Sequence, residues 1–367
     1  MSVAVLAVLL AWVGLLLFRG GFWKADQRLN GAPDREHWPD VVAVIPARDE
    51  APTIGATVAS LLGQDYPGRL HVVVIDDNST DGTAAAAGIS DRLTTIAGQP
   101  LPAGWTGKLW AVHQGIMEAV RQMPDARYLL LTDADILHEP GNLRRLVDKA
   151  EWDSLDLVSL MVHLRCESFW ERLLIPAFVF FFQKLYPFPW VNDPDRRTAG
   201  AAGGCMLVRR ETLEQAGGIA AIRDRVIDDC ALAALLKKEG PIWLGLARDG
   251  TRSLRAYESL GDVWRMVART AFVQLDRSVF KLVGTVAGMA FLYLLPPLGA
   301  LAGHPSALLA WLLMAYAYGP TLVIYRRPAW ESLLLPVAAF LYTLMTLDSA
   351  RRHWLGKGGA WKGRTYR

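Results

Sequence analysis

The sequence predicts an α/β fold with a mainly parallel sheet, carried between membrane-embedded segments at both ends of the chain. Between about residues 38 and 278, short apolar runs alternate with helix-like segments. Alternation of this kind is typical of strands joined by right-handed helical crossovers, which gives a mainly parallel sheet. The longest apolar runs lie before and after this region. We therefore expect one soluble domain at 38–278 with membrane segments on either side.

The expected strands of the soluble domain are rich in β-branched and other apolar side chains, as strands buried on both faces of a parallel sheet are. They are residues 41–46, 71–75, 93–96 and 128–131. The helices expected between them are residues 53–62, 84–87 and 108–122. Ligands of such sheets bind at the carboxyl ends of the strands, so the residues that follow each strand are the candidates for function.

The N-terminal apolar run covers residues 3–18 and is followed by Arg19, Lys24 and Arg28. A cleavable secretion signal is the alternative, but the run lacks a basic segment before it and a small-residue cleavage site after it. We expect a membrane anchor at 1–22 whose basic flank lies in the cytoplasm. This orientation places the soluble domain on the cytoplasmic side.

The C-terminal membrane region is expected at 279–350, in apolar segments of about 279–302, 306–325 and 330–347. The first two form a hairpin that crosses and returns. The third contains Pro336 and precedes a basic tail at 351–367, so a full crossing and a re-entrant segment both stay open. A further aromatic segment at 173–191 carries Gln183 and Lys184 at its centre, which favours a place at the membrane interface that admits a lipid.

The composition argues against two other classes of protein. A formal net charge of +3 over 367 residues gives no sign of nucleic-acid binding. Cys166, Cys205 and Cys230 have neither metal-ligand spacing nor a disulfide pattern. Such cysteines are typical of buried thiols in a reducing compartment.

The strand expected at 128–131 ends in Thr132-Asp133-Ala134-Asp135, which places two carboxylates one residue apart. Side chains at i and i+2 of a strand lie on one face, so the two carboxylates can converge. Together they would raise each other's pKa unless a cation lies between them. Mg²⁺ or Mn²⁺ chelated to a nucleoside diphosphate is such a cation. Taken alone, the pattern is more often a turn or a cap.

Acidic residues also follow the first two expected strands. Asp49 and Glu50 come after residues 41–46, and Asp76 and Asp77 come directly after residues 71–75. A helix N-cap is the structural alternative for the second pair. A cap needs one acid and not two, and an acid here can bind a base N–H or the ribose hydroxyls. The absence of a G-x-G-x-x-G pattern argues against a dinucleotide-binding fold.

Four motifs in order carry a resemblance to a known family: V-A-V-I-P-A-R-D-E, V-V-V-I-D-D-N-S-T-D-G-T, G-K-L-W-A-V-H-Q-G and L-L-L-T-D-A-D. Over roughly residues 40–278 the chain resembles the family 2 glycosyltransferases, which have the GT-A fold. The whole chain, with its membrane segments and basic tail, is similar to the hopene-associated glycosyltransferases of bacterial hopanoid pathways. The family usually has Asn-Glu where this chain has Asp49-Glu50.

The resemblance implies a donor site for a nucleotide sugar. Glu50 and Asp77 would hold the nucleotide, with Asp76 supporting them, and Lys108 would lie near the diphosphate. The alternative for Lys108 is a solvated lysine that opens a helix. The metal ion, Mg²⁺ or Mn²⁺, would be held by Asp133 and Asp135 and would neutralise the leaving diphosphate.

The resemblance also implies an acceptor side and a general base. Gly203 and Gly204 precede a strand and permit close approach of a sugar. Asp228 and Asp229 open a helix, where Asp229 matches the family's base, and a dipole-stabilising pair is the alternative. Because Asp228 stands where the family commonly has Glu, which of the two carboxylates takes the proton stays open.

A last family signature, Gln-x-x-Arg-Trp, is weak in this chain, which reads Gln274-Leu275-Asp276-Arg277-Ser278. The full signature marks processive polysaccharide synthases, so its weakening indicates a single transfer. Arg277 would meet the diphosphate, or else belong to a basic helix beside the membrane.

The expected function is that of an inverting glycosyltransferase of the bacterial inner membrane. It would move one sugar from a nucleotide sugar, a UDP-sugar, to a lipid hydroxyl, with a hopanoid as the acceptor that the resemblance suggests. The alternatives are a polyprenyl-phosphate glycosyltransferase, a non-catalytic membrane scaffold with a degenerate transferase domain, and a nucleotidyltransferase.

Overall fold

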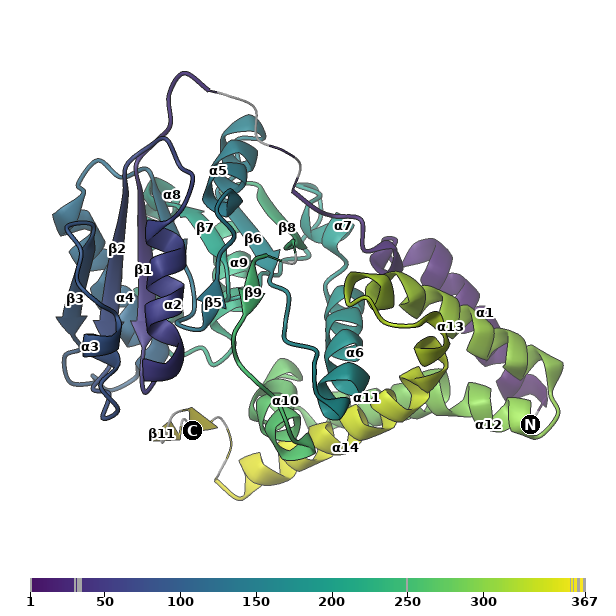
Figure 1. The fold of residues 1–367 in the computed structure, drawn as a ribbon. Helices are drawn as coiled ribbons and strands as arrows, with labels where there is room; N and C mark the ends of the chain where they lie inside the picture. Colours follow the sequence, from purple (N-terminus) through teal and green to yellow (C-terminus); the bar gives the residue numbers. More distant parts are fainter. Residues whose placement is uncertain are drawn as a thin grey trace. The chain divides into compact units, whose positions relative to one another are not determined.

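The structure is a computed structural model that describes residues 2–29, 31, 35–248, 250–356, 358, 360–361 and 364–365. The chain divides into two compact units, each described by itself below (Figure 1). The sheet unit comprises residues 26–164 and 190–255, and the helical unit comprises residues 1–25, 165–189 and 256–367. The helical unit therefore contains both membrane-like ends of the chain and the aromatic segment between them.

The sheet unit is built on a seven-stranded sheet with the order β3-β2-β1-β4-β7-β6-β8. Strand β7 is antiparallel to its neighbours β4 and β6, and the other pairings are parallel. This confirms the predicted α/β class with a mainly parallel sheet. The strands are β1 Val41–Ala47, β2 Leu70–Asp76, β3 Leu93–Ala97, β4 Tyr128–Leu131, β6 Leu157–Met161, β7 Met206–Arg209 and β8 Ile242–Leu246.

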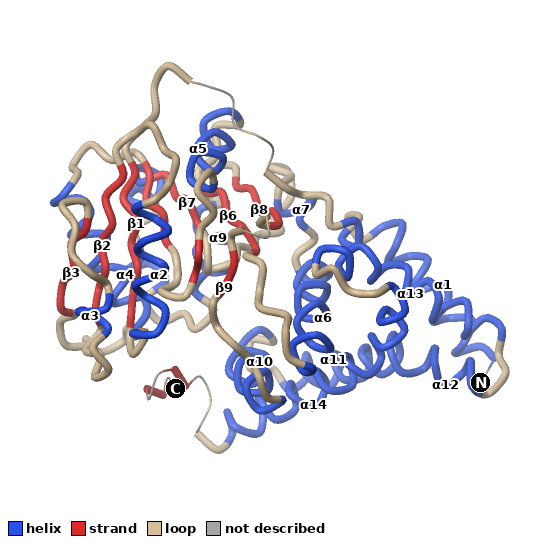
Figure 2. The backbone as a smooth tube through the Cα atoms, viewed as in Figure 1, coloured by secondary structure: helices blue, strands red, loops and turns tan. Residues whose placement is uncertain are grey.

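Helices cover both faces of this sheet, and a small two-stranded sheet of β5 (Ile136–Leu137) and β9 (Arg252–Ser253) lies beside it (Figure 2). The predicted strands and helices lie within two residues of the observed ones. The ends are clearest for β1 and β4, which are apolar runs buried over their whole length. The helices are α2 Ala51–Leu62, α3 Thr83–Ala86, α4 Gly107–Gln122, α5 Asn142–Trp152, α8 Arg210–Gln215, η2 Ile219–Ile222 and α9 Asp228–Leu236, with α7 Phe188–Val191 at the boundary between the units.

The register of the central strands brings their carboxyl ends to one edge. Ala47, the last residue of β1, pairs with Asp76, the last residue of β2, and the Asp77 N–H donates to the Ala47 carbonyl at 2.8 Å. Helix α4 lies close to these strands at Gly115, where a Cβ atom would clash with the side chains of Ile75 and Val44. The glycine lets α4 approach the sheet and places its first turn beside the strand ends.

The helical unit packs around an aromatic core that includes Trp12, Phe180, Tyr293 and Tyr342. Within it, η3 is a π-helical turn, and the Trp12 Nε1–H donates at 2.8 Å to the carbonyl of Leu292 in that turn. The elements are α1 Ser2–Phe18, η1 Phe22–Lys24, α6 Phe169–Leu185, α10 Leu260–Gln274, α11 Val279–Met289, η3 Ala290–Leu294, α12 Leu295–Leu301, α13 Pro305–Ile324, η4 Ala329–Leu334, α14 Leu335–Trp354, β10 Ala360–Trp361 and β11 Arg364–Thr365.

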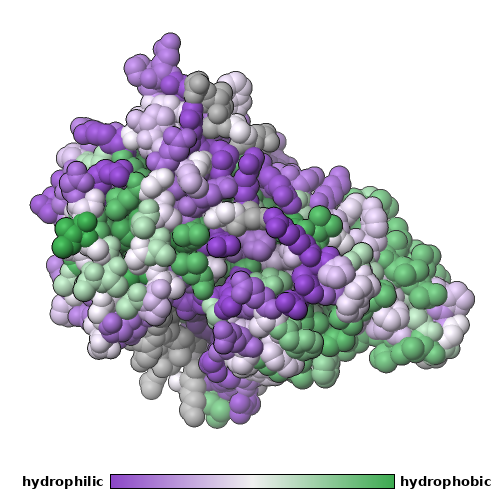
Figure 3. Space-filling view, in the orientation of Figure 1, coloured by the Kyte–Doolittle hydropathy of each residue, from purple (hydrophilic) through white to green (hydrophobic). Residues whose placement is uncertain are grey.

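Four helices among the described residues are long and apolar enough to cross a membrane: Phe169–Val191, Val279–Leu301, Pro305–Ile324 and Ala329–Trp354. Exposed apolar side chains gather around α1, α12 and α13 (Figure 3). The segment predicted at the interface, 173–191, thus also has the length and composition of a spanning helix. Pro336 does not break the last segment, because it lies in the first turn of α14, where its missing N–H has no partner to lose.

Two further predictions concern the tail and the cysteines. Residues 357, 359, 362–363 and 366–367 of the expected basic tail lie outside the described residues. The three cysteines are free thiols: Cys205 is buried, as predicted, whereas Cys166 and Cys230 are only half-buried.

Candidate functional site

The acids that follow β1 and β2 form one connected loop structure. The Arg48 guanidinium donates to the Asp77 carbonyl at 2.6 Å and lies 3.7 Å from the carboxylate of Asp77, whose side chain is buried. Asp76 accepts the Ser79 N–H at 2.9 Å, and Asp49 accepts the Thr80 N–H at 2.9 Å. The two loops therefore fix each other. Neither Asp76 nor Asp77 bonds the start of α3; the acid that does so is Asp81, which accepts the Thr83 N–H at 3.0 Å.

Glu50 stands at the start of α2 and is fixed through its backbone. Its N–H donates to the Thr83 hydroxyl at 2.8 Å, which ties the start of α2 to the start of α3. Glu50, Asp76 and Asp77 thus lie at the edge where β1 and β2 end, which is where ligands of parallel sheets bind. Their contact with a nucleotide stays a prediction.

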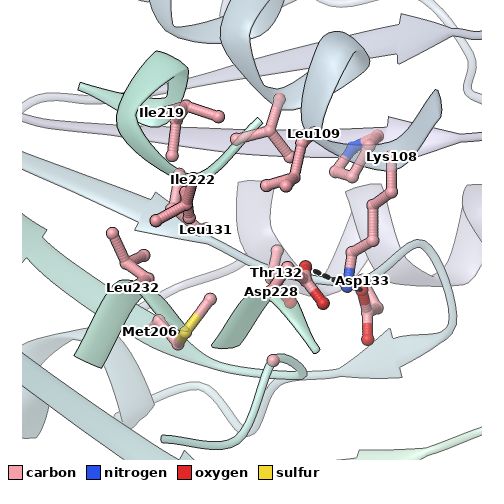
Figure 4. Close-up of a pocket in the computed structure, with 13 residues that line it drawn as sticks. Lys108, Leu109, Leu131, Thr132, Asp133, Met206, Ile219, Ile222, Asp228 and Leu232 are labelled. Atoms are coloured by element: carbon pink, nitrogen blue, oxygen red, sulfur yellow. Dashed lines mark ion pairs between the residues drawn. The ribbon is translucent and has the colours of Figure 1, made fainter. Parts of the chain in front are cut away.

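Lys108 joins acids from two distant segments. Thr106 caps α4 by accepting the Leu109 N–H, which places Lys108 in the first helical turn. The Lys108 Nζ lies 2.9 Å from Asp133 Oδ1 and 3.0 Å from Asp228 Oδ2 (Figure 4). Burial alone would lower the pKa of Lys108, but the two carboxylates outweigh it and hold that pKa well above its ordinary value. Lys108 is therefore not a solvated helix lysine.

Asp229 lies next to this ion pair and is held by backbone amides. Its Oδ2 accepts the Gly203 N–H at 3.0 Å, and its Oδ1 accepts the Cys230 N–H at 2.7 Å. Burial, followed by the negative charge of Asp228, raises the pKa of Asp229 to about 6. We call Lys108, Asp133, Asp228, Asp229 and Gly203 the Lys108 cluster.

The two adjacent glycines have different surroundings. A Cβ atom on Gly203 would lie 3.4 Å from the Lys108 Nζ and 3.6 Å from Asp229 Oδ2. A Cβ atom on Gly204 would instead meet Val162 and Ile136, and the Gly204 carbonyl accepts the Thr132 hydroxyl at 2.7 Å. Gly203 therefore faces the charged cluster, whereas Gly204 packs into the structure behind it.

A pocket opens beside the Lys108 cluster (Figure 4). Lys108, Asp133 and Asp228 supply its charged part. The rest of its wall is formed by Pro46, Leu109, Val112, Leu131, Thr132, Gly203, Met206, Ile219, Ile222 and Leu232. A largely apolar pocket with a few convergent charges is the usual form of a small-molecule site.

Asp135 has different partners from Asp133. The Arg255 Nε donates to Asp135 Oδ2 at 2.7 Å, and the terminal nitrogen of the same guanidinium donates to Glu50 Oε1 at 2.7 Å. We call Arg255, Glu50 and Asp135 the Arg255 bridge. Sequence reasoning missed Arg255, because it belongs to no motif and its partners lie 120 and 205 residues away.

Asp133 and Asp135 are the predicted ligands of a divalent metal ion. Within the described residues, no group of three His, Cys, Asp or Glu side chains could hold a metal by itself. Mg²⁺ at nucleotide sites, however, takes only one or two carboxylates and completes its shell with phosphate oxygens and water. Asp133 is 37% exposed at the pocket, whereas Asp135 is 8% exposed beneath Arg255. These carboxylates therefore fit a metal ion that binds together with a diphosphate. Asp133, the more exposed of the two, would be the first to contact it.

One site residue that the resemblance implied, Arg277, belongs to the other unit of the chain. Arg277 follows α10 in the helical unit and has a left-handed backbone, with φ of 51° at Asp276 and 57° at Arg277. The other implied residues, Glu50, Asp76, Asp77, Lys108, Asp133, Asp135, Gly203, Gly204, Asp228 and Asp229, belong to the sheet unit. The contact of Arg277 with a diphosphate stays a prediction.

Comparison with known proteins agrees with the fold. Residues 42–217 match the sequence profile of the family described as Glycosyl transferase family 2. An N-acetylglucosaminyltransferase from Mesorhizobium japonicum is 45% identical over 198 residues, which are 49% of this chain and 42% of that protein. A beta-monoglucosyldiacylglycerol synthase from Synechocystis is 40% identical over 63 residues, or 17% of this chain and 13% of that protein. The matched segments therefore span less than half the length of these relatives.

Among solved structures, the chain is similar to a mannosyltransferase from Pyrobaculum calidifontis that was determined with GDP-mannose and Mn²⁺. The TM-score is 0.48 at 21% identity, and the alignment covers 93% of this chain and 99% of that one. Together with the sheet order, the family profile identifies the sheet unit as a GT-A-like α/β fold.

Proposed function

We propose that this chain moves one sugar from a nucleotide sugar, a UDP-sugar, onto a lipid hydroxyl, in keeping with the match of residues 42–217 to the family 2 glycosyltransferase profile. The observation that carries this proposal is the Lys108 cluster. It places Asp229, a carboxylate whose pKa is raised to about 6, next to Asp228 and the lysine that pairs with it. Lys108 is held above its ordinary pKa and lines the pocket together with Asp133 and Asp228. Transfer of a glycosyl group to a hydroxyl is helped by a proton acceptor and by a positive charge near the leaving group.

Asp229 is the proposed general base. A base works best when its pKa lies near the working pH, and burial brings Asp229 closer to that point. The N–H groups of Gly203 and Cys230 fix the orientation of its carboxylate. As the acceptor oxygen attacks the anomeric carbon, Asp229 takes the hydroxyl proton. The new C–O bond forms while the bond to the diphosphate breaks on the opposite face, which inverts the anomeric centre.

Asp228 has a supporting role in this proposal. Its carboxylate forms an ion pair with Lys108 at 3.0 Å, whereas the carboxylate of Asp229 accepts backbone N–H groups. Its negative charge also contributes to the raised pKa of Asp229. This difference favours Asp229 over Asp228 as the residue that accepts the proton.

The leaving diphosphate would be bound by Lys108 and by a metal ion that the neighbouring acids hold. The Lys108 ammonium offers a strong donor for phosphate oxygens. Asp133, with Asp135 as the second predicted ligand, would hold a Mg²⁺ or Mn²⁺ ion whose charge offsets the charge on the diphosphate. Glu50 and Asp77, supported by Asp76, would hold the nucleotide, and Arg277 would contact the diphosphate.

A membrane lipid is the proposed acceptor. Four apolar helices in the same chain support this choice, and one relative is a beta-monoglucosyldiacylglycerol synthase. The basic residues Arg19, Lys24 and Arg28 after the first apolar run support a cytoplasmic catalytic domain at the bacterial inner membrane. A hopanoid acceptor rests on the resemblance alone.

The test measures release of nucleoside diphosphate by the purified full-length protein in detergent. UDP-glucose, UDP-N-acetylglucosamine, UDP-galactose and GDP-mannose are compared, with and without bacterial lipid extract and Mn²⁺. We expect release from one donor that requires lipid. Asp229→Asn should lower it by about 100-fold or more, while Asp224→Asn, an exposed acid in the same segment, should leave it unchanged.

Two results would contradict the proposal. An unchanged rate in Asp229→Asn would indicate an acceptor that needs no base, such as a polyprenyl phosphate. Failure of every donor, together with no binding of UDP or GDP, would favour a scaffold without activity.

A further inference from the structure

Arg255 bridges two acids that the sequence places on different strands. Glu50 follows β1 and Asp135 follows β4, and both accept hydrogen bonds of 2.7 Å from one guanidinium. The side chains of Glu50 and Asp135 are 14% and 8% exposed, whereas Arg255 is 40% exposed. The acids are therefore largely buried, and the cation that neutralises them is accessible from outside.

The position of Arg255 is fixed by strand β9, which ends two residues before it. Strand β9 pairs with β5, which begins directly after Asp135, and the Leu254 N–H donates to the Asp135 carbonyl at 2.7 Å. The Ser253 hydroxyl contacts the Asp135 carboxylate at 3.4 Å and accepts the Arg255 N–H at 3.2 Å. Residues 253–255 thus contact both the backbone and the side chain of Asp135. The position of Arg255 is therefore set by several hydrogen bonds and not by its ion pairs alone.

Both acids of the Asp-Ala-Asp motif consequently have a cation from the chain itself. Asp133 pairs with Lys108, and Asp135 pairs with Arg255. Two carboxylates at one guanidinium would repel each other if that guanidinium were lost, and they would then attract another cation. A free divalent ion must compete with Lys108 and Arg255 for these oxygens. A diphosphate changes this competition, because its anionic oxygens can bind the Arg255 guanidinium in place of the carboxylates.

We propose that Arg255 is a positioning residue that withholds Asp135 and Glu50 from free divalent ions, so that metal binds tightly only together with a nucleoside diphosphate. This inference rests on the proposed function, because it assigns the diphosphate and the metal to the same edge of the sheet. The coupling is reciprocal: whatever factor the nucleotide adds to metal affinity, the metal adds to nucleotide affinity.

The experiment measures Mn²⁺ binding to the full-length protein by electron paramagnetic resonance, alone and with UDP or GDP. The wild type should bind Mn²⁺ weakly alone and far more tightly with the nucleotide. Arg255→Gln should bind Mn²⁺ alone roughly tenfold more tightly, because a competing charge is lost. The gain from adding the nucleotide should shrink by a similar factor.

Two further variants separate this role from a structural one. Arg255→Lys keeps the charge but not the two-pronged geometry, so its affinity for Mn²⁺ alone should fall between wild type and Arg255→Gln. Arg252→Gln removes an exposed arginine from β9, just before Arg255, and should match the wild type. If Arg255→Gln does not fold, as judged by its thermal unfolding, Arg255→Lys alone carries the test.

The outcomes distinguish this inference from the proposed function. Wild type that binds nucleotide and metal together, with Arg255→Gln and Arg255→Lys indistinguishable from Arg252→Gln, overturns the role of Arg255 and leaves the proposed function intact. Wild type that binds neither UDP nor GDP, with or without Mn²⁺, overturns both.

Discussion

The Lys108 cluster and the Arg255 bridge each place one cation between two acids, but they hold it differently. Lys108 is 24% exposed and pairs with acids from the β4 end and the start of α9. Arg255 is 40% exposed and lies over acids that are more deeply buried than itself. The first arrangement encloses its cation, and the second leaves its cation open to exchange. This difference suggests that the Lys108 cluster serves the chemical step and the Arg255 bridge serves ligand entry.

The largest difference between the two arrangements should appear when each cation is removed. Lys108→Gln leaves Asp133 and Asp228 without their shared partner. We expect kcat/KM to fall by about 100-fold and the free energy of unfolding to fall by about 1–2 kcal/mol, allowing for partial exposure of the group. Arg255→Gln should cost less than about 1 kcal/mol, because its guanidinium is more exposed. Steady-state kinetics and thermal unfolding in detergent measure both.

Equal losses of activity and stability in the two variants would remove the distinction between the arrangements. Arg210→Gln, which alters a cation of the sheet unit outside both arrangements, serves as the control.

A second, smaller effect concerns pH. The pKa of Asp229 is raised to about 6, mainly by burial and then by Asp228. The carboxylate is protonated below that value, so kcat/KM should rise with pH up to about 6 and then level off. The folded protein also binds this proton more tightly than the unfolded chain, so the contribution of Asp229 to stability is present at low pH and is lost as pH rises from about 4 to 6.

Asp228→Asn sharpens this prediction. It removes the neighbouring negative charge, so the rising limb of the pH profile should move to lower pH. At pH 5 the rate, relative to its own plateau, should increase about threefold. A limb that stays in place would mean that Asp228 does not influence the base. Asp224→Asn, on an exposed acid, should leave the profile unchanged.

The smallest effects should come from substitution of the two glycines. One substitution should mainly change activity and the other should mainly change stability. Gly203→Ala places a methyl group 3.4 Å from the Lys108 Nζ in ordinary contact. It should lower kcat/KM a fewfold and change stability by less than about 0.5 kcal/mol. Gly204→Ala crowds Val162 and Ile136 at 3.1–3.3 Å and should cost about 1 kcal/mol of stability. If both variants change activity and stability alike, the assignment of Gly203 to the Lys108 cluster is wrong.

Much of the sheet unit follows from the sequence, because its central strands are buried apolar runs that end in acids. Val41–Ala47 and Tyr128–Leu131 are wholly buried, so their ends could be predicted to within a residue. Acids that directly follow such strands could also be predicted to meet at one edge. The ion pair between Asp133 and Lys108 could not be predicted, because it depends on how closely α4 approaches the sheet.

Other features depend on contacts over long sequence separations. The pairing of β5 with β9 joins two-residue strands that carry no periodic pattern. Together with the hydrogen bond from the Leu254 N–H to the Asp135 carbonyl, it brings Arg255 to Asp135. The aromatic segment at 173–191 was expected at the interface because of Gln183 and Lys184. In the structure Gln183 contacts Thr321 and Lys184 contacts Tyr293, so both polar groups are satisfied within the helical unit and do not require water.

The hydrogen bond from Trp12 to the Leu292 carbonyl has a consequence for the N-terminal helix. A π-helical turn departs from the regular ladder of backbone hydrogen bonds, and an unsatisfied carbonyl in a hydrocarbon environment is costly. Trp12, fully buried in α1, supplies the donor for such a carbonyl in η3. Helix α1 is therefore part of the packed structure of the helical unit, and a chain shortened by residues 2–18 would lose this hydrogen bond.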